Sequence, residues 1–190
     1  MIEKAVKILE IIDELRENAQ EINDQDLKAV EHLIVEANRI FVGGAGRSGF
    51  AARGFSNRLM HLGYTVFFVG EPTTPSIQEG DLLIVGSGSG NTASLVENTK
   101  KAKSQGAKVA TVTMFPENKI GSMADAVIKI PGMTEKVEGK VSGKLKTTVQ
   151  AEGSSFEELS WITYDAMVVD LMRITNQSDK DLFARHANME

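Results

Sequence analysis

Two loops rich in glycine and serine carry the residues best suited to bind a phosphate group. GGAGRSG, at residues 43–49, follows an apolar run and opens an amphipathic stretch, and SGSGNT, at residues 87–92, has the same placement. Gly and Ser at the start of a helix present backbone N–H groups and hydroxyls, which favour an anion. The sequence therefore predicts a small phosphorylated ligand held from both sides.

The first loop also fits two other interpretations. Gly44, Gly46 and Gly49 satisfy GxGxxG, and Glu71 follows 22 residues after Gly49, where a dinucleotide site would bind the ribose. Alternatively, Gly43 and Gly44 only allow a tight turn between strand and helix. A hydride-transfer enzyme also needs a substrate domain, for which 190 residues leave little room. The second loop therefore favours the small phosphorylated ligand.

Three charged or titratable side chains could take part in chemistry beside these loops. Arg47 lies between the glycines of the first loop and could offset negative charge on a ligand, or could simply be solvated. His61 could transfer a proton or cap a helix before Gly63. His186 has the same ambiguity and needs a tail ordered against a neighbour to act. His32 falls on the polar side of its helix and receives no role.

No metal site is predicted. The chain has no cysteine, so neither disulfides nor thiolate-bound zinc can support the fold. The three histidines lack HxxxH or HExxH spacing.

The elements that position these residues follow from short apolar runs alternating with amphipathic stretches. The runs are RIFVGG, TVFFVG, DLLIVG, KVATVTM and AVIKI, and the predicted helices between them cover 48–62, 91–104 and a short 120–124. Strands this rich in Val, Ile and Phe without clean alternation are typical of a parallel sheet buried on both faces. We therefore expect an α/β fold with a five-stranded parallel sheet.

Helices are predicted both before and after this sheet region in the sequence. Residues 2–21 form a helix with an apolar stripe wide enough for a second partner, and a second helix starts after Asn23 or Asp24. The last long helix, about 155–174, is apolar nearly all round, as a core or interface helix is. Ser178 caps a short helix in the tail. The run from Pro131 to Gly153 is too long for a routine connection and is expected to be a lid or a mobile segment.

Composition excludes several classes of protein. With 21 Lys and Arg against 26 Asp and Glu, the net charge is −5 and the basic residues are scattered, which argues against nucleic-acid binding. No apolar run approaches the roughly 20 residues that span a membrane. The start, MIEKAVKILE, does not resemble a signal peptide, so the cytoplasm is the expected location.

Several stretches together resemble the sugar isomerase (SIS) domain family. They are GAGRSG, HLGYTVFFVGEPTTPSIQEGDLLIVGSGSGNT, GSSFEEL and the ending RHANME, and VGEPTTPS with that ending narrows the resemblance to the hexuloisomerase branch of the ribulose monophosphate pathway. The resemblance implies one SIS domain over 1–190, with N-terminal helices at 2–38 and a helical tail at 155–190. It implies a flavodoxin-like three-layer α/β/α sandwich.

The resemblance also implies a reaction and the residues that perform it. The enzyme would interconvert D-arabino-3-hexulose 6-phosphate and fructose 6-phosphate through a cis-enediolate, with no metal or organic cofactor. Glu157 resembles the family's base, although Glu157 or Glu158 could equally be a first-turn glutamate that favours the helix dipole. The family also implies a homotetramer in which a neighbouring chain supplies a histidine, His61 or His186, to each site. The implied binding residues are Gly46, Ser48, Ser87, Gly88, Ser89 and Thr92.

Two alternatives remain. The same fold could isomerise an arabinose or heptulose phosphate. It could instead be a sensor of sugar phosphates, because SIS domains also occur in regulators. The sensor is disfavoured, since only about 38 residues precede the sheet and they contain no basic recognition helix.

Overall fold

The computed structural model describes residues 5–135, 141–144 and 147–189. Two helices precede the sheet, α1 (Val6–Ala19) and α2 (Asp24–Glu36). The strands and helices of the central region are β1 (Ile40–Gly44), α3 (Gly46–His61), β2 (Val66–Phe68), β3 (Leu82–Gly86), α4 (Ala93–Ser104), β4 (Lys108–Thr113), η1 (Gly121–Met123) and β5 (Ala126–Lys129). The chain continues with β6 (Gly132–Met133), β7 (Val141–Ser142), α5 (Ser154–Ile174) and α6 (Asp179–Ala184).

The five predicted strands form one parallel sheet in the order β2-β1-β3-β4-β5. The chain adds β2 on one side of β1 and then β3 on the other side, so the order in which strands are added reverses between β1 and β3. Gly44 pairs in register with Gly86, so the loops that follow β1 and β3 start side by side at the carboxyl edge. In open α/β sheets, this is the place where ligands bind. The fold predicted from the sequence is confirmed.

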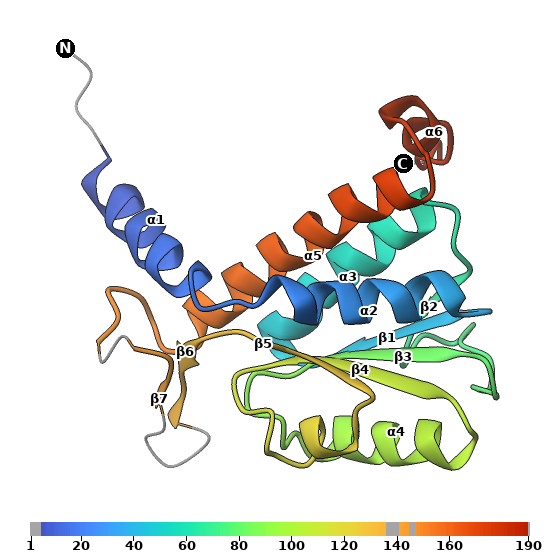
Figure 1. Cartoon of the computed structure of the whole chain (residues 1–190), viewed down its shortest axis with the longest axis horizontal. Helices are drawn as coiled ribbons and strands as arrows, with labels where there is room; N and C mark the ends of the chain where they lie inside the picture. The colour runs from blue at the N-terminus through green and yellow to red at the C-terminus, as the bar shows by residue number, and fades with distance from the viewer. Residues whose placement is uncertain (1–4, 136–140, 145–146, 190) are drawn as a thin grey trace.

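Helices cover both faces of the sheet, as Figure 1 shows. One buried cluster joins α2, α3 and α5 to the sheet, and includes Val30, Phe55 and Met167. The other joins α4 to the opposite face through Leu95, Val96 and Ala102. Because apolar residues are buried on both sides, β1 and β3 need the continuous apolar runs seen in their sequences.

The helix boundaries agree closely with the expectations. Asn23 caps α2 by accepting from the Gln25 N–H at 3.0 Å. The predicted helix over 2–21 is described from Val6, and residues 2–4 lie outside the described residues. His32 is exposed, and its Nε2 lies 3.3 Å from the Glu36 carboxylate.

The outer faces of α1 and α5 carry exposed apolar side chains. They are Val6, Ile8, Leu9, Ile12, Trp161, Ile162, Val169 and Ile174. The helix predicted at 155–174 is therefore buried on one face only, and the other face is apolar but exposed.

The 131–153 segment contains a short antiparallel hairpin, β6 with β7, near the N-terminal end of α5 (Figure 1). Residues 136–140 and 145–146 of the predicted lid lie outside the described residues.

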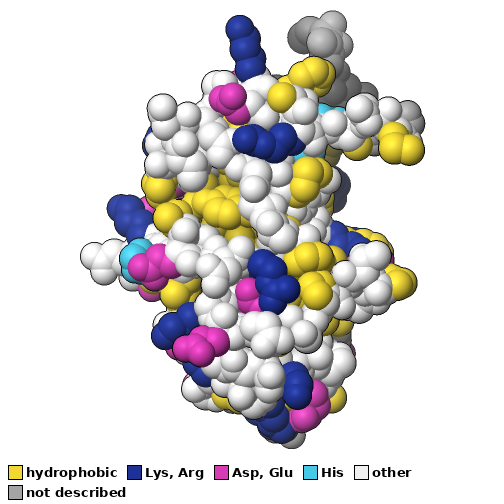
Figure 2. Space-filling view, turned by 90° about the vertical axis from the view of Figure 1, so that its right-hand side faces the viewer, with side chains coloured by type: hydrophobic (Ala, Val, Ile, Leu, Met, Phe, Trp, Pro, Cys, Tyr) yellow, Lys and Arg dark blue, Asp and Glu magenta, His cyan; other side chains and the backbone are white. Residues whose placement is uncertain are grey.

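Charges on the surface are mixed in sign. Figure 2 shows Lys and Arg side chains scattered over one face, several of them beside Asp or Glu, with hydrophobic side chains exposed among them. No helix in the described part of the chain is long and apolar enough to cross a membrane.

Candidate active site

A cavity of about 200 Å³ lies at the carboxyl edge of the sheet, next to the ends of β1 and β3. All six binding residues predicted from the sequence line it, and so does Glu157. The other lining residues are Ala45, Gly86, Leu95, Met114, Thr134, Glu152, Gly153 and Phe156. The structure therefore brings the two predicted loops and the predicted base to one place.

The first loop is held by a close approach between two glycines. A Cβ on Gly49 would lie 2.9 Å from the carbonyl carbon and oxygen of Gly44. A side chain at either position would push the start of α3 away from β1. Gly46 adopts φ +59°, a conformation that favours glycine.

The second loop is held by the next strand and the loop after it. The Ser87 N–H donates to the Val112 carbonyl at 3.0 Å, and the Met114 N–H donates to the Gly88 carbonyl at 3.0 Å. The Asn118 amide donates to the Ser89 carbonyl at 2.8 Å. These bonds fix the loop backbone and leave the Ser87 hydroxyl, which is buried, without a partner among the described residues.

Three helices begin at this cavity. The first turns or N-caps of α3, α4 and α5 contribute Gly46, Thr92 and Gly153 to its lining. Among the residues that the structure describes, no side chain caps the N-terminus of any of these three helices. Helix α2 provides a contrast, because Asn23 caps it. Uncapped helix N-termini leave backbone N–H groups available and carry partial positive charge. The cavity is suited to an anion.

Glu157 forms an ion pair with Arg47 between α5 and α3. Glu157 lines the cavity, whereas Arg47 lines a neighbouring pocket. The Arg47 Nε donates to Glu157 Oε2, and this bond raises the pKa of the Arg47 guanidinium. The Glu157 side chain is 19% exposed and Arg47 is 64% exposed. The carboxylate is therefore oriented by a cation that itself faces solvent.

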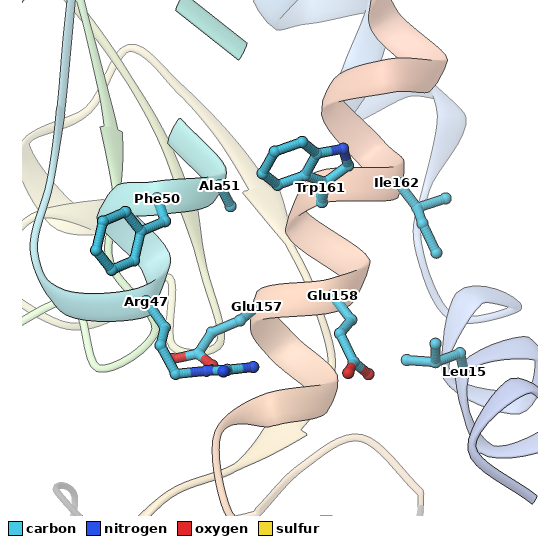
Figure 3. A pocket seen from close by; sticks show the side chains of 8 residues that line it. All are labelled: Leu15, Arg47, Phe50, Ala51, Glu157, Glu158, Trp161 and Ile162. Carbon is cyan, nitrogen blue, oxygen red and sulfur yellow. The ribbon is translucent and has the colours of Figure 1, made fainter. Parts of the chain in front are cut away.

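The neighbouring carboxylate, Glu158, lies elsewhere. Figure 3 shows Glu157 directed toward Arg47, and Glu158 directed toward Leu15 of α1. Glu157 lines both the cavity at the carboxyl edge of the sheet and a second pocket next to it. Glu158 lines only the second pocket. The structure thus distinguishes two glutamates that the sequence leaves equivalent.

The second pocket is wide and mostly apolar, with a volume of about 440 Å³. Phe50 and Trp161 contribute to it and are 67% and 47% exposed. It lies beside the Arg47–Glu157 pair (Figure 3).

The two candidate histidines do not reach the cavity within one chain. His61 is the last residue of α3 and Arg47 lies in its first turn, so about 21 Å of helix separates them. The His61 ring is buried and stacks on the His186 ring, with 5.1 Å between centroids. Burial lowers the pKa of His61, and the nearby His186 and Arg58 lower it further.

Glu71, the candidate ribose ligand, is paired with Arg53 at 2.6 Å. The guanidinium of Arg53 also lies over the Phe68 ring, 3.9 Å from its centroid. Glu71 thus already has a cationic partner in this structure.

Sequence reasoning missed the contributions of the 131–153 segment to the cavity. Thr134, Glu152 and Gly153 line it, and Phe156 packs closely under Gly88. The only sequence signal was the length of the segment, which indicates a lid but does not show which of its residues meet the ligand.

Comparisons with known proteins find one matching domain family and several similar proteins. Residues 33–151 match the SIS domain family. The chain is 40% identical to a 3-hexulose-6-phosphate isomerase of Bacillus subtilis (strain 168), over 96% of this chain and 97% of that protein. It is 37% identical to a 3-hexulose-6-phosphate isomerase of Mycobacterium gastri, over 94% of this chain and 87% of that one.

A solved structure shows the same fold. A Methanococcus jannaschii protein, inferred to function as a 3-hexulose-6-phosphate isomerase, superposes with a TM-score of 0.77 at 32% identity, over 97% of each chain.

Proposed function

Because this chain belongs to the SIS domain family, we propose that it is a sugar-phosphate isomerase that interconverts D-arabino-3-hexulose 6-phosphate and fructose 6-phosphate. The observation that carries the proposal is the cavity where the N-termini of α3, α4 and α5 meet the carboxylate of Glu157. The relatives at 37–40% identity support the choice of sugar.

The phosphate is assigned to the serine-rich side of the cavity. Ser48, Ser87, Ser89 and Thr92 supply hydroxyls there, and the N-termini of α3 and α4 supply backbone N–H groups. The buried Ser87 hydroxyl lacks a partner among the described residues, and a phosphate oxygen would accept its hydrogen bond.

Glu157 is assigned the transfer of the proton between C2 and C3. Its carboxylate takes the proton from C2 of the 3-hexulose, and the electron pair of that C–H bond forms the C2–C3 double bond of an enediolate as the C3 carbonyl becomes an oxyanion. The same carboxyl returns the proton to C3. The hydroxyl proton at O2 passes to O3, C2 becomes the carbonyl carbon, and no atom is gained or lost.

Arg47 is assigned the stabilisation of negative charge. Its Nε orients the Glu157 carboxylate, and the positive charge of the guanidinium beside that carboxylate would offset the negative charge of the enediolate. The N-terminus of α5 adds partial positive charge on the same side.

A homo-oligomer, a tetramer by the family resemblance, is part of the proposal. The pocket beside the Arg47–Glu157 pair is apolar and open, with Phe50, Trp161 and Ile162 exposed around it, and α1 exposes further apolar residues nearby. Patches of this kind mark surfaces that contact a partner. Another copy seated here could bring the His61–His186 pair to the site, where a histidine would exchange protons with O2 and O3.

The direct test is to incubate the purified protein with 3-hexulose 6-phosphate and measure fructose 6-phosphate. We expect rapid conversion, and little conversion of arabinose 5-phosphate under the same conditions. Conversion of arabinose 5-phosphate alone would assign a different sugar to the same site. Greater thermal protection by NAD than by sugar phosphate would instead support the dinucleotide interpretation of GxGxxG.

A further inference from the structure

Helix α1 buries polar side chains and exposes apolar ones. Glu14 and Asn18 are 8% and 4% exposed, whereas Ile8, Leu9 and Ile12 on the same helix are exposed. Glu14 and Asn18 are four residues apart and so share one face of the helix. Burying a carboxylate and an amide costs free energy unless their hydrogen bonds are satisfied. The hydrogen-bond partners of these two side chains therefore show what the buried face of α1 holds in place.

The buried carboxylate binds one short stretch of chain more than 130 residues away. Glu14 accepts from the Thr148 hydroxyl at 2.9 Å, from the Val149 N–H at 2.8 Å and from the Gln150 amide at 3.4 Å. One further turn along α1, the Asn18 amide donates to the Ser155 hydroxyl at 2.9 Å. Beyond the end of the helix, Glu21 accepts from the Lys144 N–H at 2.9 Å.

These bonds end at the wall of the candidate active site. Residues 148–150 are followed closely by Glu152 and Gly153, which line the cavity at the carboxyl edge of the sheet. The first turn of α5, with Glu157, comes next. Ser155, held by Asn18, lies two residues before Glu157 in that turn. Gly153 has φ +86°, and within the described part of the chain no side chain caps α5, so the helix itself offers few local restraints at this end.

We propose that Glu14 and Asn18 are positioning residues, which hold residues 147–155 so that Gly153 and Glu157 meet the substrate in the reactive geometry. This inference rests on the proposed function, because it assigns Glu157 the role of base. Neither residue lines the cavity that Glu157 shares with the phosphate loops, so their effect is through the segment they hold. Displacing a reacting group by about 1 Å can lower a rate by about 100-fold.

The test replaces the acceptor without removing its bulk. Glu14→Gln is nearly isosteric but puts an NH₂ group where one oxygen accepts. Glu17→Gln is the matched control, since Glu17 lies on the same helix, is exposed and undergoes the same change of charge. Thr148→Val removes the hydroxyl that donates to Glu14 and accepts from the Gln150 N–H, and it leaves α1 intact, which keeps the test valid if Glu14→Gln folds poorly.

We expect Glu14→Gln to lower kcat about tenfold per folded molecule with KM within about twofold, because the phosphate loops are untouched. Hydrogen exchange at residues 147–153 should become at least tenfold faster, while exchange in β1 and β3 stays as in the parent. Thr148→Val should shift both readouts in the same direction, and Glu17→Gln should shift neither.

A lower melting temperature with unchanged kcat per folded molecule would overturn the positioning role and leave Glu14 a purely structural residue. Unchanged exchange at 147–153 in both variants would overturn it as well. If the parent chain converts no sugar phosphate, the proposed function fails, and unaltered exchange then separately refutes the claim that Glu14 fixes this segment.

Discussion

His61 and His186 stack on each other at the end of α3 opposite to Glu157, with 5.1 Å between ring centroids. The tail holds this arrangement, because Arg185 donates to the His61 carbonyl at 2.9 Å and to the Gln177 amide oxygen at 2.8 Å. The two histidines that the sequence left as alternatives therefore form one unit. Each residue of this pair is too far from the cavity of its own chain to act there.

The first prediction concerns the base. Glu157→Gln should lower kcat by about 10² to 10⁴, the usual contribution of a positioned general base, with little change in KM. Glu158→Gln is the control, since Glu158 is directed toward α1 and does not line the cavity at the carboxyl edge of the sheet. Steady-state kinetics with 3-hexulose 6-phosphate measure both. Equal losses in the two variants would mean that the wrong carboxylate has been chosen.

The second prediction concerns the phosphate. Inorganic phosphate and fructose 6-phosphate should raise the melting temperature, because a ligand that binds only the folded state stabilises it by mass action. Ser87→Ala should reduce this protection and raise KM about tenfold, since it removes one hydrogen bond to a charged group. Ser89→Ala should act in the same direction.

Ser104→Ala is the control for this measurement, because Ser104 is exposed at the far end of α4 and bonds only the Lys101 carbonyl among the described partners. Equal protection by unphosphorylated fructose would contradict the assignment of the serines to phosphate.

The third prediction concerns the packing of the first loop. Gly49→Ala places a Cβ 2.9 Å from the Gly44 backbone, so either α3 or β1 must shift. We expect a loss of about 1–3 kcal/mol in the free energy of unfolding, as overpacked sites show. Gly43→Ala meets only ordinary contacts at 3.8 Å and should lower stability much less than Gly49→Ala does. Urea unfolding compares the two, and equal midpoints would show that the close approach is easily relieved.

Much of the site could be predicted because of the parallel sheet. Each strand is a buried apolar run, and all carboxyl ends of such strands meet at one edge, so GGAGRSG and SGSGNT had to lie close together once both were placed after strands. Gly44 and Gly86 at the ends of β1 and β3 confirm this directly.

The rest depends on chain paths that periodicity does not encode. The Arg47–Glu157 pair joins residues 110 positions apart, and its formation depends on how α5 crosses α3. Thr134 and Glu152 reach the cavity from a segment whose described residues include the two short strands β6 and β7. The apolar stripe of α1 predicted a partner for its apolar residues, but did not reveal that Glu14 and Asn18 form its buried face.

The fourth prediction concerns acid sensitivity. Burial, His186 and Arg58 lower the pKa of His61 in the folded protein below the value of about 6.5 in the unfolded chain. Below pH 6.5 the unfolded state therefore binds the proton more readily, so stability is full above this pH and falls as the pH drops through the lowered pKa of the folded state. The melting temperature should fall from pH 7 to 5, and should fall less in His61→Gln and in His186→Ala. Identical pH profiles in all three proteins would mean that His61 does not contribute.

The fifth prediction tests whether the histidine acts across subunits. Within one chain about 21 Å of helix separates His61 from Arg47, so a catalytic His61 must come from a neighbouring copy. Glu157→Gln and His61→Ala homo-oligomers should each be impaired, yet co-expressing the two chains should restore part of the activity, because some mixed sites combine an intact Glu157 with an intact His61. His32→Ala replaces His61→Ala in the control, since His32 is exposed and lies beside Glu36. Mixed oligomers that form but remain as inactive as the separate variants would show that His61 only supports the end of α3, and the same co-expression with His186→Ala then asks whether the other ring of the stacked pair enters the site.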